Sequence, residues 1–412
     1  MTNPLYDAYA VLRRVYGGGA YLKQALAETP IEPAERARTA KLCYGVLEND
    51  RYLDFCIRSF ASKNPKLPVR ILLKVALYML LFLDKPRYMV ADNAVSLVKK
   101  MGKGGASGFV NAFLRAFDEE KLKLPQGEEG LALRCSWPDF AVRRVIVQYG
   151  ADAEEILRPR PARTFVRFRD EAAEQKYRAA ERGERTPFPL VWSFSSFRRE
   201  EGYDRGEYTF QSVGSVAICA AVDPCDRLLD ACAAPGGKSV LLAAKCGGVT
   251  ACELHPHRAK LIESYCARMG VQNVEVVCRD SSVFEPVYEG RFDAVLVDAP
   301  CSGSGVAGEN PDIKLFRKEG DIPALAAVQR RLLSACARYV RPGGSLYYST
   351  CSFFEEENDG SVAAFLEQDT AFAPVPLESP LGHRRTRYGL QFLPNLSMGA
   401  GFYVAKLTRN EL

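Results

Sequence analysis

Residues 228–239 have the sequence LLDACAAPGGKS, in which an apolar run ends at an acid and a glycine pair opens a helical stretch. Gly236 and Gly237 allow a tight turn and a close approach to a ligand, while Lys238 and Ser239 begin the predicted helix. The turn has neither the GxGxxG spacing of a dinucleotide site nor the GxxxxGK[ST] spacing of a P-loop. It therefore predicts a strand, a ligand-side turn and a helix.

The same arrangement recurs from about residue 210 onward, where apolar runs alternate with helical patterns. Five such runs follow one another: DRLLDA (226–231), GGVTACEL (247–254), VEVVCRD (274–280), FDAVLVDAP (292–300) and GSLYYST (344–350). This alternation predicts an α/β domain with a parallel, doubly wound, Rossmann-like sheet. Ligands of such sheets bind at the carboxyl ends of the strands.

Each of the five predicted strands ends at a polar side chain: Asp230, Glu253, Asp280, Asp298 and Cys351. Acids also cap strand-to-helix turns, but the regularity of the series favours a ligand pocket. Glu253 lies about 20 residues past the glycine turn, where an acid accepts the ribose hydroxyls of an adenosine group. Asp280 would lie by the adenine and Asp298 by the charged end of the ligand. Because carboxylates suit a cation, we expect S-adenosylmethionine as the cofactor.

Two of the 13 cysteines, Cys301 and Cys351, follow predicted strands in polar turns on the ligand side. A thiolate that adds to carbon 6 of cytosine makes carbon 5 nucleophilic towards a methyl sulfonium, and the adduct must afterwards lose a proton and expel the thiol. Burial as a small apolar residue is the alternative, which we accept for cysteines in helical patterns. Their polar context allows a lowered thiol pKa. The residues alone leave open which cysteine forms the bond.

Residues 5–125 predict helices and no strand. The segment VRILLKVALYMLLFL (69–83) is nearly all apolar, as in the central helix of a bundle, and MGKGGASGFVNAFLRAF (101–117) carries Phe109 and other apolar residues on one face. Residues 1–125 hold 20 Lys and Arg against 12 Asp and Glu, whereas residues 210–412 hold 20 against 23. This positive excess indicates a polyanionic partner or a merely charged helical surface.

The region between these parts, residues 126–209, is balanced in charge. Its segment RTFVRFR (163–169) predicts a short strand with Arg163, Arg167 and Arg169 on one face. We interpret this face either as an exposed edge kept soluble by charge or as an RNA contact.

Several protein classes are disfavoured by composition. No run approaches the roughly 20 apolar residues of a membrane span, and the N-terminal sequence lacks the layout of a signal peptide. The odd number of cysteines without CxxC pairs, with only three histidines, argues against disulfides and a structural metal. We therefore expect a cytoplasmic protein with free thiols, no metal and no membrane association, acting as a monomer.

The motifs LDACAAPGGKS, DAPCSGSG, NPDIK, YSTCS with EEN, and GFYVAKL together resemble the RNA cytosine-5 methyltransferases of the Sun and NOP2 type, over about residues 205 to 410. The front segments LCYGVLENDRYLDF and GFVNAFLRAF resemble the helical RNA-binding domain of NusB-type antitermination factors. That combination is typical of the RsmB (Sun) branch. The resemblance implies a NusB-like domain at 1–128, a small connecting subdomain at 129–209 and a methyltransferase domain at 210–412.

The resemblance also implies roles for individual residues. Cys351 matches the family nucleophile, Cys301 the cysteine that assists product release, and Asp298 an acid near both cofactor and cytosine. The methionine-side loop corresponds to Cys232, Ala233, Ala234, Pro235, Gly236, Gly237 and Lys238, and the remaining pocket residues to Glu253 and Asp280. The implied substrate is a cytosine in 16S ribosomal RNA before full subunit assembly. Ser212, Asn93 and Ala400 depart from the family pattern at positions that bear on RNA specificity.

Three other functions remain as alternatives. The basic front region is compatible with a non-catalytic, antitermination-like RNA-binding factor that keeps a retired methyltransferase fold. A cytosine-5 methyltransferase acting on transfer RNA has the same chemistry. A methyltransferase for adenine, protein or a small molecule is disfavoured, because amino methylation typically uses an Asn/Asp-Pro-Pro-aromatic turn where this chain has Asp-Ala-Pro-Cys.

Overall fold

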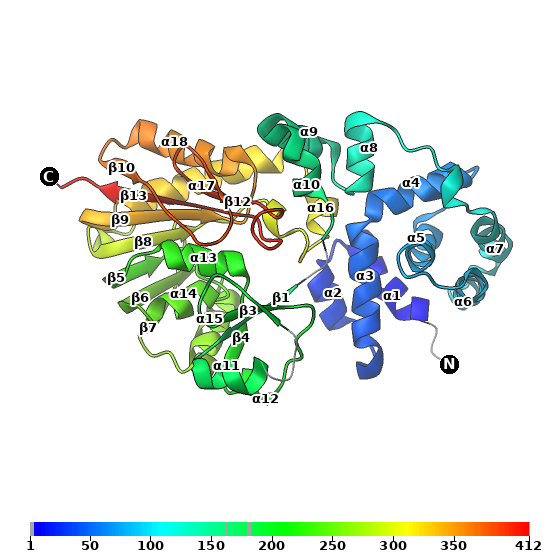
Figure 1. Ribbon diagram of the computed structural model, residues 1–412, viewed down its shortest axis with the longest axis horizontal. Coiled ribbons are helices and arrows are strands. Elements are labelled where there is room, and N and C mark those ends of the chain that lie inside the picture. The colour runs from blue at the N-terminus through cyan, green and yellow to red at the C-terminus, as the bar shows by residue number, and fades with distance from the viewer. Residues whose placement is uncertain (1–3, 161–162, 179–182, 412) are drawn as a thin grey trace. The chain divides into compact units, whose positions relative to one another are not determined.

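The structure, a computed structural model, describes residues 4–160, 163–178 and 183–411 (Figure 1). The described residues form two compact units. The N-terminal unit extends to Pro159 and includes Ala307–Arg317, whereas the C-terminal unit comprises Arg160–Val306 and Lys318 onward. The segment Ala307–Arg317 lies between the two cysteine motifs in sequence but packs with the N-terminal unit. The division into three domains stays a prediction.

The described part of the N-terminal unit is helical, as predicted for residues 5–125. Its helices are α1 (Pro4–Gly18), α2 (Leu22–Glu28), α3 (Arg36–Glu48), α4 (Asp50–Phe60), α5 (Leu67–Leu81), α6 (Arg87–Lys100), α7 (Ser107–Ala116), α8 (Gly127–Arg134), α9 (Asp139–Tyr149), α10 (Ala153–Leu157) and α16 (Ile313–Phe316).

Helix α5 is the centre of this unit, as its apolar sequence predicts. It packs against α1, α3, α4 and α6, and its side chains from Ile71 to Met79 are buried. Lys74 is a buried cation within this run, and its Nζ lies 2.6 Å from Asp50 Oδ1. A helix that is apolar on all sides must be surrounded by other helices, which explains the bundle.

A four-stranded sheet with the order β2-β3-β1-β4 opens the C-terminal unit. Its elements are β1 (Thr164–Phe168), α11 (Glu171–Arg178), β2 (Gly183–Arg185), β3 (Val191–Phe194), α12 (Glu201–Asp204) and β4 (Tyr208–Phe210). The interpretation of residues 163–169 as an edge strand is wrong, because β1 pairs with β3 and β4 on its two sides. Two of the arginines in this segment form hydrogen bonds within the C-terminal unit. Arg163 Nε donates to Ser193 Oγ, and Arg167 Nε donates to Gln211 Oε1 at 2.7 Å.

The main sheet has the order β11-β12-β13-β9-β8-β5-β6-β7, with β10 paired to β13. Its strands are β5 (Cys225–Asp230), β6 (Cys246–Glu253), β7 (Val274–Cys278), β8 (Phe292–Asp298), β9 (Val340–Thr350), β10 (Phe372–Val375), β11 (Arg384–Arg385), β12 (Gly389–Phe392) and β13 (Phe402–Arg409). Strands β5 to β9 are parallel, as predicted. Strands β10 to β13 extend the sheet with antiparallel pairs, which the alternation of strands and helices did not predict.

Helices cover both faces of this sheet (Figure 1). One face packs against α13 (Val213–Ala221), α14 (Gly237–Ala243) and α15 (Pro256–Met269), and the other against α17 (Asp321–Ala337) and α18 (Asp359–Gln368). Burial on both faces explains why the strands are continuous apolar runs. The strand order reverses between β5 and β8, and the carboxyl ends of these two strands define the crevice where ligands of such folds bind.

Candidate active site

The glycine turn lies at the carboxyl end of β5, as predicted. Gly236 has φ of 103°, and a Cβ atom there would come within 3.1 Å of the backbone of Ile262 in α15. Both the dihedral and the close approach require glycine. The Ala233 N–H donates to Cys252 O at 2.9 Å, which fixes the turn against the end of β6. The turn therefore presents backbone at the crevice.

Asp230 is the acid at the end of β5, and it is fully buried. Its Oδ2 accepts a 2.7 Å hydrogen bond from Ser239 Oγ, while Oδ1 has no hydrogen-bond partner. Burial raises the pKa of this carboxyl to about 6. An unpaired buried acceptor beside a ligand crevice suits a donor supplied by the ligand.

The acids after β6 and β7 differ in burial. Glu253 is 4% exposed, and its Oε1 accepts from the His255 N–H at 3.0 Å and lies 3.4 Å from Arg258 Nη1. Asp280 is exposed, and its Oδ1 accepts from the Ser282 hydroxyl and N–H, which lower its pKa. Because β5, β6 and β7 are neighbouring parallel strands, the acids that follow them lie on the same side of the sheet, at the carboxyl ends of the strands.

Asp298, at the carboxyl end of β8, and Lys238, near the start of α14, form an ion pair. Lys238 Nζ lies 2.7 Å from Asp298 Oδ2, and Asp298 Oδ1 accepts from Ser349 Oγ at 2.8 Å. Burial alone would lower the pKa of Lys238, but the Asp298 charge outweighs burial and the pKa is raised. Asp298 is therefore held by the glycine-turn helix on one side and by β9 on the other.

The structure brings Cys301 and Cys351 together. Their Sγ atoms lie 3.0 Å apart, and the Cys351 N–H donates to Cys301 Sγ at 3.2 Å. The two residues follow β8 and β9, which are parallel neighbours with Asp298 opposite Ser349. The lowered thiol pKa that the sequence context allows is not found at Cys301, because its hydrogen bond with Cys351 and its burial raise the pKa well above the usual value. Cys301 therefore keeps its proton.

The two cysteine loops are joined by Glu357, whose role the sequence did not reveal. This fully buried carboxylate accepts from the Ser302 N–H at 2.7 Å, from Ser352 Oγ at 2.6 Å and from Gln329 Nε2 at 3.1 Å. Ser302 follows Cys301 and Ser352 follows Cys351, so one side chain fixes the positions of both thiols. Glu357 lies in the EEN motif, so the sequence singled out this residue, but the motif did not indicate which groups it would bind.

Gln211 is a second residue that sequence reasoning missed. Its Oε1 accepts from Arg167, and its Nε2 donates to Gly237 O at 3.0 Å, so it connects β1 to the glycine turn. Next to it, Ser212 caps α13 by accepting from the Ser215 N–H at 3.3 Å. Ser212, one of the three positions that depart from the family pattern, therefore serves in this chain as a helix cap.

Comparisons with known proteins agree with this geometry. Residues 217–408 match the family described as 16S rRNA methyltransferase RsmB/F, and residues 7–119 match the NusB family. The chain is 30% identical over 418 residues to the probable ribosomal RNA small subunit methyltransferase B of Bacillus subtilis (strain 168), with 94% of each chain covered. This chain belongs to the RsmB/F methyltransferase family.

Another relative supports the assignment to the RsmB/F family. The ribosomal RNA small subunit methyltransferase B of Sodalis glossinidius (strain morsitans) is 31% identical over 409 residues, covering 93% of this chain and 92% of the relative. As an RsmB/F member, the protein is an S-adenosylmethionine-dependent methyltransferase, which confirms the predicted enzyme class and cofactor. The alternative of a non-catalytic factor with a retired fold is set aside.

Two solved structures confirm the fold of this RsmB/F protein. The crystal structure of PH0851 matches with a TM-score of 0.83 at 23% identity and covers 98% of each chain. The structure of NSun6 from Pyrococcus horikoshii with SFG matches with a TM-score of 0.60 at 19% identity, covering 67% of this chain and 99% of that one. The predicted helical bundle followed by an α/β methyltransferase domain is confirmed.

The residues at the crevice fit the RsmB/F cofactor chemically. The free Oδ1 of Asp230 offers an acceptor to an ammonium group, Glu253 is placed to accept hydroxyls, and the bare turn at Gly236 leaves room for close approach. Within the described ranges, no group of three or more His, Cys, Asp or Glu side chains could hold a metal ion. Among the same residues, no helix is both long and apolar enough to cross a membrane. The monomeric state and cytoplasmic location stay predictions.

Proposed function

We propose that this protein methylates carbon 5 of a cytosine in 16S ribosomal RNA through a transient bond between Cys351 and carbon 6 of the ring. The observation that carries this proposal is the 3.0 Å separation of the two thiols at the carboxyl ends of β8 and β9. Relatives along nearly the whole chain are named ribosomal RNA small subunit methyltransferases, which supports the RNA substrate. Because the ring face must be accessible, the target is an unstacked cytosine in unassembled or partly assembled RNA.

The reaction begins when a base takes the proton of the Cys351 thiol and the sulfur electron pair adds to carbon 6. Carbon 5 becomes enamine-like and takes the methyl group, which S-adenosylmethionine supplies. A base then removes the proton from carbon 5, and the carbon–sulfur bond breaks with its electron pair returning to Cys351. Cys301, with its raised pKa and its sulfur 3.0 Å away, keeps its proton and donates a hydrogen bond to the departing thiolate, which stabilises the leaving group.

The cofactor roles follow the positions of the crevice residues. In this proposal the loop from Cys232 to Lys238 holds the methionine part, Glu253 accepts the ribose hydroxyls and Asp280 lies by the adenine. Asp298, ion-paired with Lys238, orients the reacting end beside the cytosine. Burial raises the pKa of the Cys232 thiol well above its usual value, which supports a packing role rather than a nucleophilic one for that cysteine.

The test is methyl transfer from labelled S-adenosylmethionine to a 16S ribosomal RNA transcript and, separately, to transfer RNA. Cys351→Ala should abolish transfer, while Cys225→Ala, which removes a half-buried cysteine at the amino end of β5, away from the carboxyl ends of the strands, should leave it unchanged. Bisulfite sequencing then identifies the methylated cytosine. Normal transfer by Cys351→Ala would refute the nucleophile, and labelling of transfer RNA alone would replace the ribosomal substrate.

A further inference from the structure

A basic hollow of about 650 Å³ lies in the N-terminal unit between the α4–α5 connection and the glycine-rich turn before α7. Lys63, Lys66 and Lys103 line it, together with Gly105 and Phe109. All its lining residues belong to the described ranges, and none of them is acidic. None of the three lysines forms an ion pair with a described residue. Three like charges around one hollow repel one another unless an anion lies between them.

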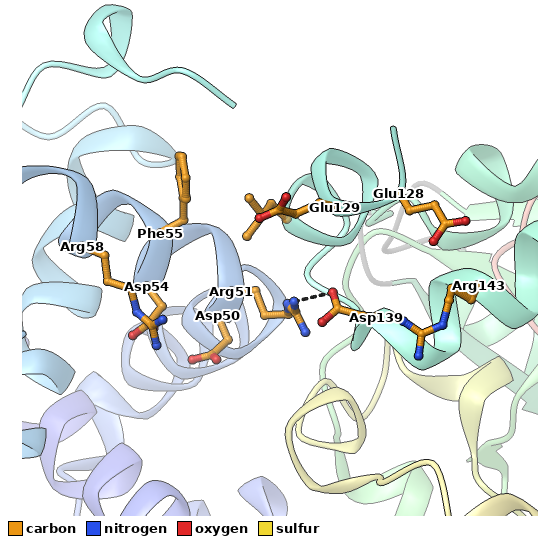
Figure 2. Close-up of a pocket in the computed structure, with 10 residues that line it drawn as sticks. Asp50, Arg51, Asp54, Phe55, Arg58, Glu128, Glu129, Asp139 and Arg143 are labelled. Atoms are coloured by element: carbon orange, nitrogen blue, oxygen red, sulfur yellow. Dashed lines mark hydrogen bonds and ion pairs between the residues drawn. The ribbon is translucent and has the colours of Figure 1, made fainter. Parts of the chain in front are cut away.

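A second hollow of the same unit, of about 730 Å³, shows the opposite arrangement (Figure 2). Its lining combines acids with arginines, and Figure 2 shows Arg51 directed at Asp139, with Nη2 and Oδ1 2.6 Å apart. Arg58 pairs with Asp54 at 2.8 Å in the same way. Arginines of that hollow are therefore paired with acids of the same hollow, whereas no acid lines the basic hollow.

The two glycines beside the basic hollow, Gly104 and Gly105, are not required by the local backbone conformation or by close packing. A Cβ atom at Gly104 or Gly105 would meet nothing within 4 Å, and neither residue has a positive φ. Larger residues would therefore fit without strain, yet both positions carry no side chain. The helices that start at the hollow, α5 and α7, have no side-chain cap at their N-termini. The positive ends of the two helix dipoles add further positive potential.

Phe109 adds an aromatic surface to the same place. The sequence pattern groups it with the apolar face of α7, and Val110, Phe113 and Leu114 of that helix are indeed buried. Phe109 is instead 37% exposed and lines the hollow. Lysines that bind phosphates, next to a ring on which a base stacks, are the combination that binds single-stranded nucleic acid.

We propose that this hollow binds a single-stranded segment of the RNA, with phosphates at Lys63, Lys66, Lys103 and the Gly104–Gly105 amides and an unpaired base stacked on Phe109. The inference rests on the proposed function in that RNA is the substrate, and it adds the place of an RNA contact outside the catalytic unit. It also accounts for part of the positive excess of residues 1–125.

The test measures binding of a fluorescein-labelled, mixed-sequence single-stranded RNA to the full-length protein by fluorescence anisotropy over a range of salt concentrations. The variant Lys63→Ala/Lys66→Ala/Lys103→Ala should bind at least about tenfold more weakly, with a salt slope reduced by about 2, since each single-strand phosphate contact contributes about 0.7. The matched control Lys41→Ala/Lys85→Ala/Lys123→Ala removes the same charge from exposed positions of the same unit and should bind almost as well as the wild type.

A second pair of variants tests stacking. Phe109→Ala should weaken binding about tenfold without changing the salt slope, whereas Tyr88→Ala, which removes a ring that is 75% exposed, should not. Far-UV circular dichroism and thermal unfolding verify that every variant keeps the helical N-terminal unit folded. Equal losses in the two lysine triples, or no RNA binding by the wild type, would overturn this inference. RNA binding at the hollow without methylation of any RNA would overturn the proposed function alone.

Discussion

The two thiols of the active site are close in space but differ in their environment. Cys301 Sγ accepts the Cys351 N–H and has a raised pKa, so its proton is retained next to the sulfur that leaves the adduct. We therefore expect Cys301→Ala to slow release and to accumulate a protein–RNA adduct that survives denaturing electrophoresis. Cys351→Ala should form no adduct under the same conditions.

The double variant Cys301→Ala/Cys351→Ala is the control for this prediction, because it removes the bond that the single Cys301 variant would trap. An adduct in the double variant would show that another residue attacks the RNA. Absence of any adduct with Cys301→Ala and a methylated substrate RNA would contradict the release role.

Glu357 is the residue on which the geometry of both cysteine loops depends. Replacement by Gln puts an amide donor opposite groups that donate to this side chain, and a buried mismatch of this kind costs about 2 kcal/mol. Glu357→Gln should therefore lower the free energy of unfolding by about that amount in urea titrations. It should also reduce the turnover number more than the affinity for S-adenosylmethionine, because the thiols move while the pocket acids stay.

The comparison for Glu357 is Glu355→Gln, which changes an exposed acid two residues earlier. We expect that variant to be as stable and as active as the wild type. If both variants behaved alike, the hydrogen bonds of Glu357 would have no part in positioning the cysteines.

At the scale of elements, the short helix α16 contacts the C-terminal ends of α3 and α8 through Lys314. Lys314 Nζ donates to Glu48 O, the last residue of α3, at 3.2 Å and to Cys135 O, just past α8, at 3.1 Å. A cation at helix C-termini is favourable. Burial nevertheless lowers the pKa of Lys314 to about 8, because the nearby Glu48 only partly offsets the loss of hydration.

This lowered pKa predicts a pH dependence of stability. Between about pH 8 and 10.5 the unfolded chain binds more protons at Lys314 than the folded chain does, so the free energy of unfolding rises with pH in this window. The wild type should gain up to about 3 kcal/mol over Lys314→Met between these limits in urea titrations. A constant difference between the two proteins would show that Lys314 is not buried in this way.

Helix α2 depends on a residue far away in sequence. Tyr21 at its N-terminus provides no side-chain cap, and Asp312 Oδ2 instead accepts from the Leu22 N–H at 2.8 Å. Asp312→Ala should lower the free energy of unfolding by about 1 kcal/mol. Hydrogen exchange should accelerate at the α2 amides while those of α5 stay protected, and uniform acceleration would contradict a local capping role.

At the scale of the whole molecule, the segment Ala307–Arg317 belongs to one unit and is covalently continuous with the other. Its Leu315 and Phe316 pack against the core of the N-terminal unit, and the Phe316 ring contacts that of Tyr21. We expect a fragment of residues 160–412 to aggregate, because it would expose these side chains together with Lys314. Replacing residues 307–317 by a Gly/Ser linker in that fragment should restore solubility, as measured by size-exclusion chromatography.

Much of the fold was predictable because its signals are local. Strands β5 to β9 are continuous apolar runs, and the acids or cysteines that follow them have to lie at one edge of a parallel sheet. The antiparallel strands β10 to β13 were missed, since short strands joined by irregular loops lack a clear period. The interpretation of β1 as an edge strand was wrong, because a strand of five residues does not encode the number of its neighbours.

The sequence by itself determined the helical and α/β classes, the glycine turn and the two candidate cysteines, since these depend on periodicity and on residue order along the chain. Only the tertiary structure decided that the two thiols are 3.0 Å apart, that Cys301 has a raised pKa, and that Glu357 joins both loops. It also decided that Lys314 and Asp312 fold with the N-terminal unit. The physical reason is that burial, hydrogen bonding and charge pairing depend on neighbours that packing brings together from distant parts of the chain.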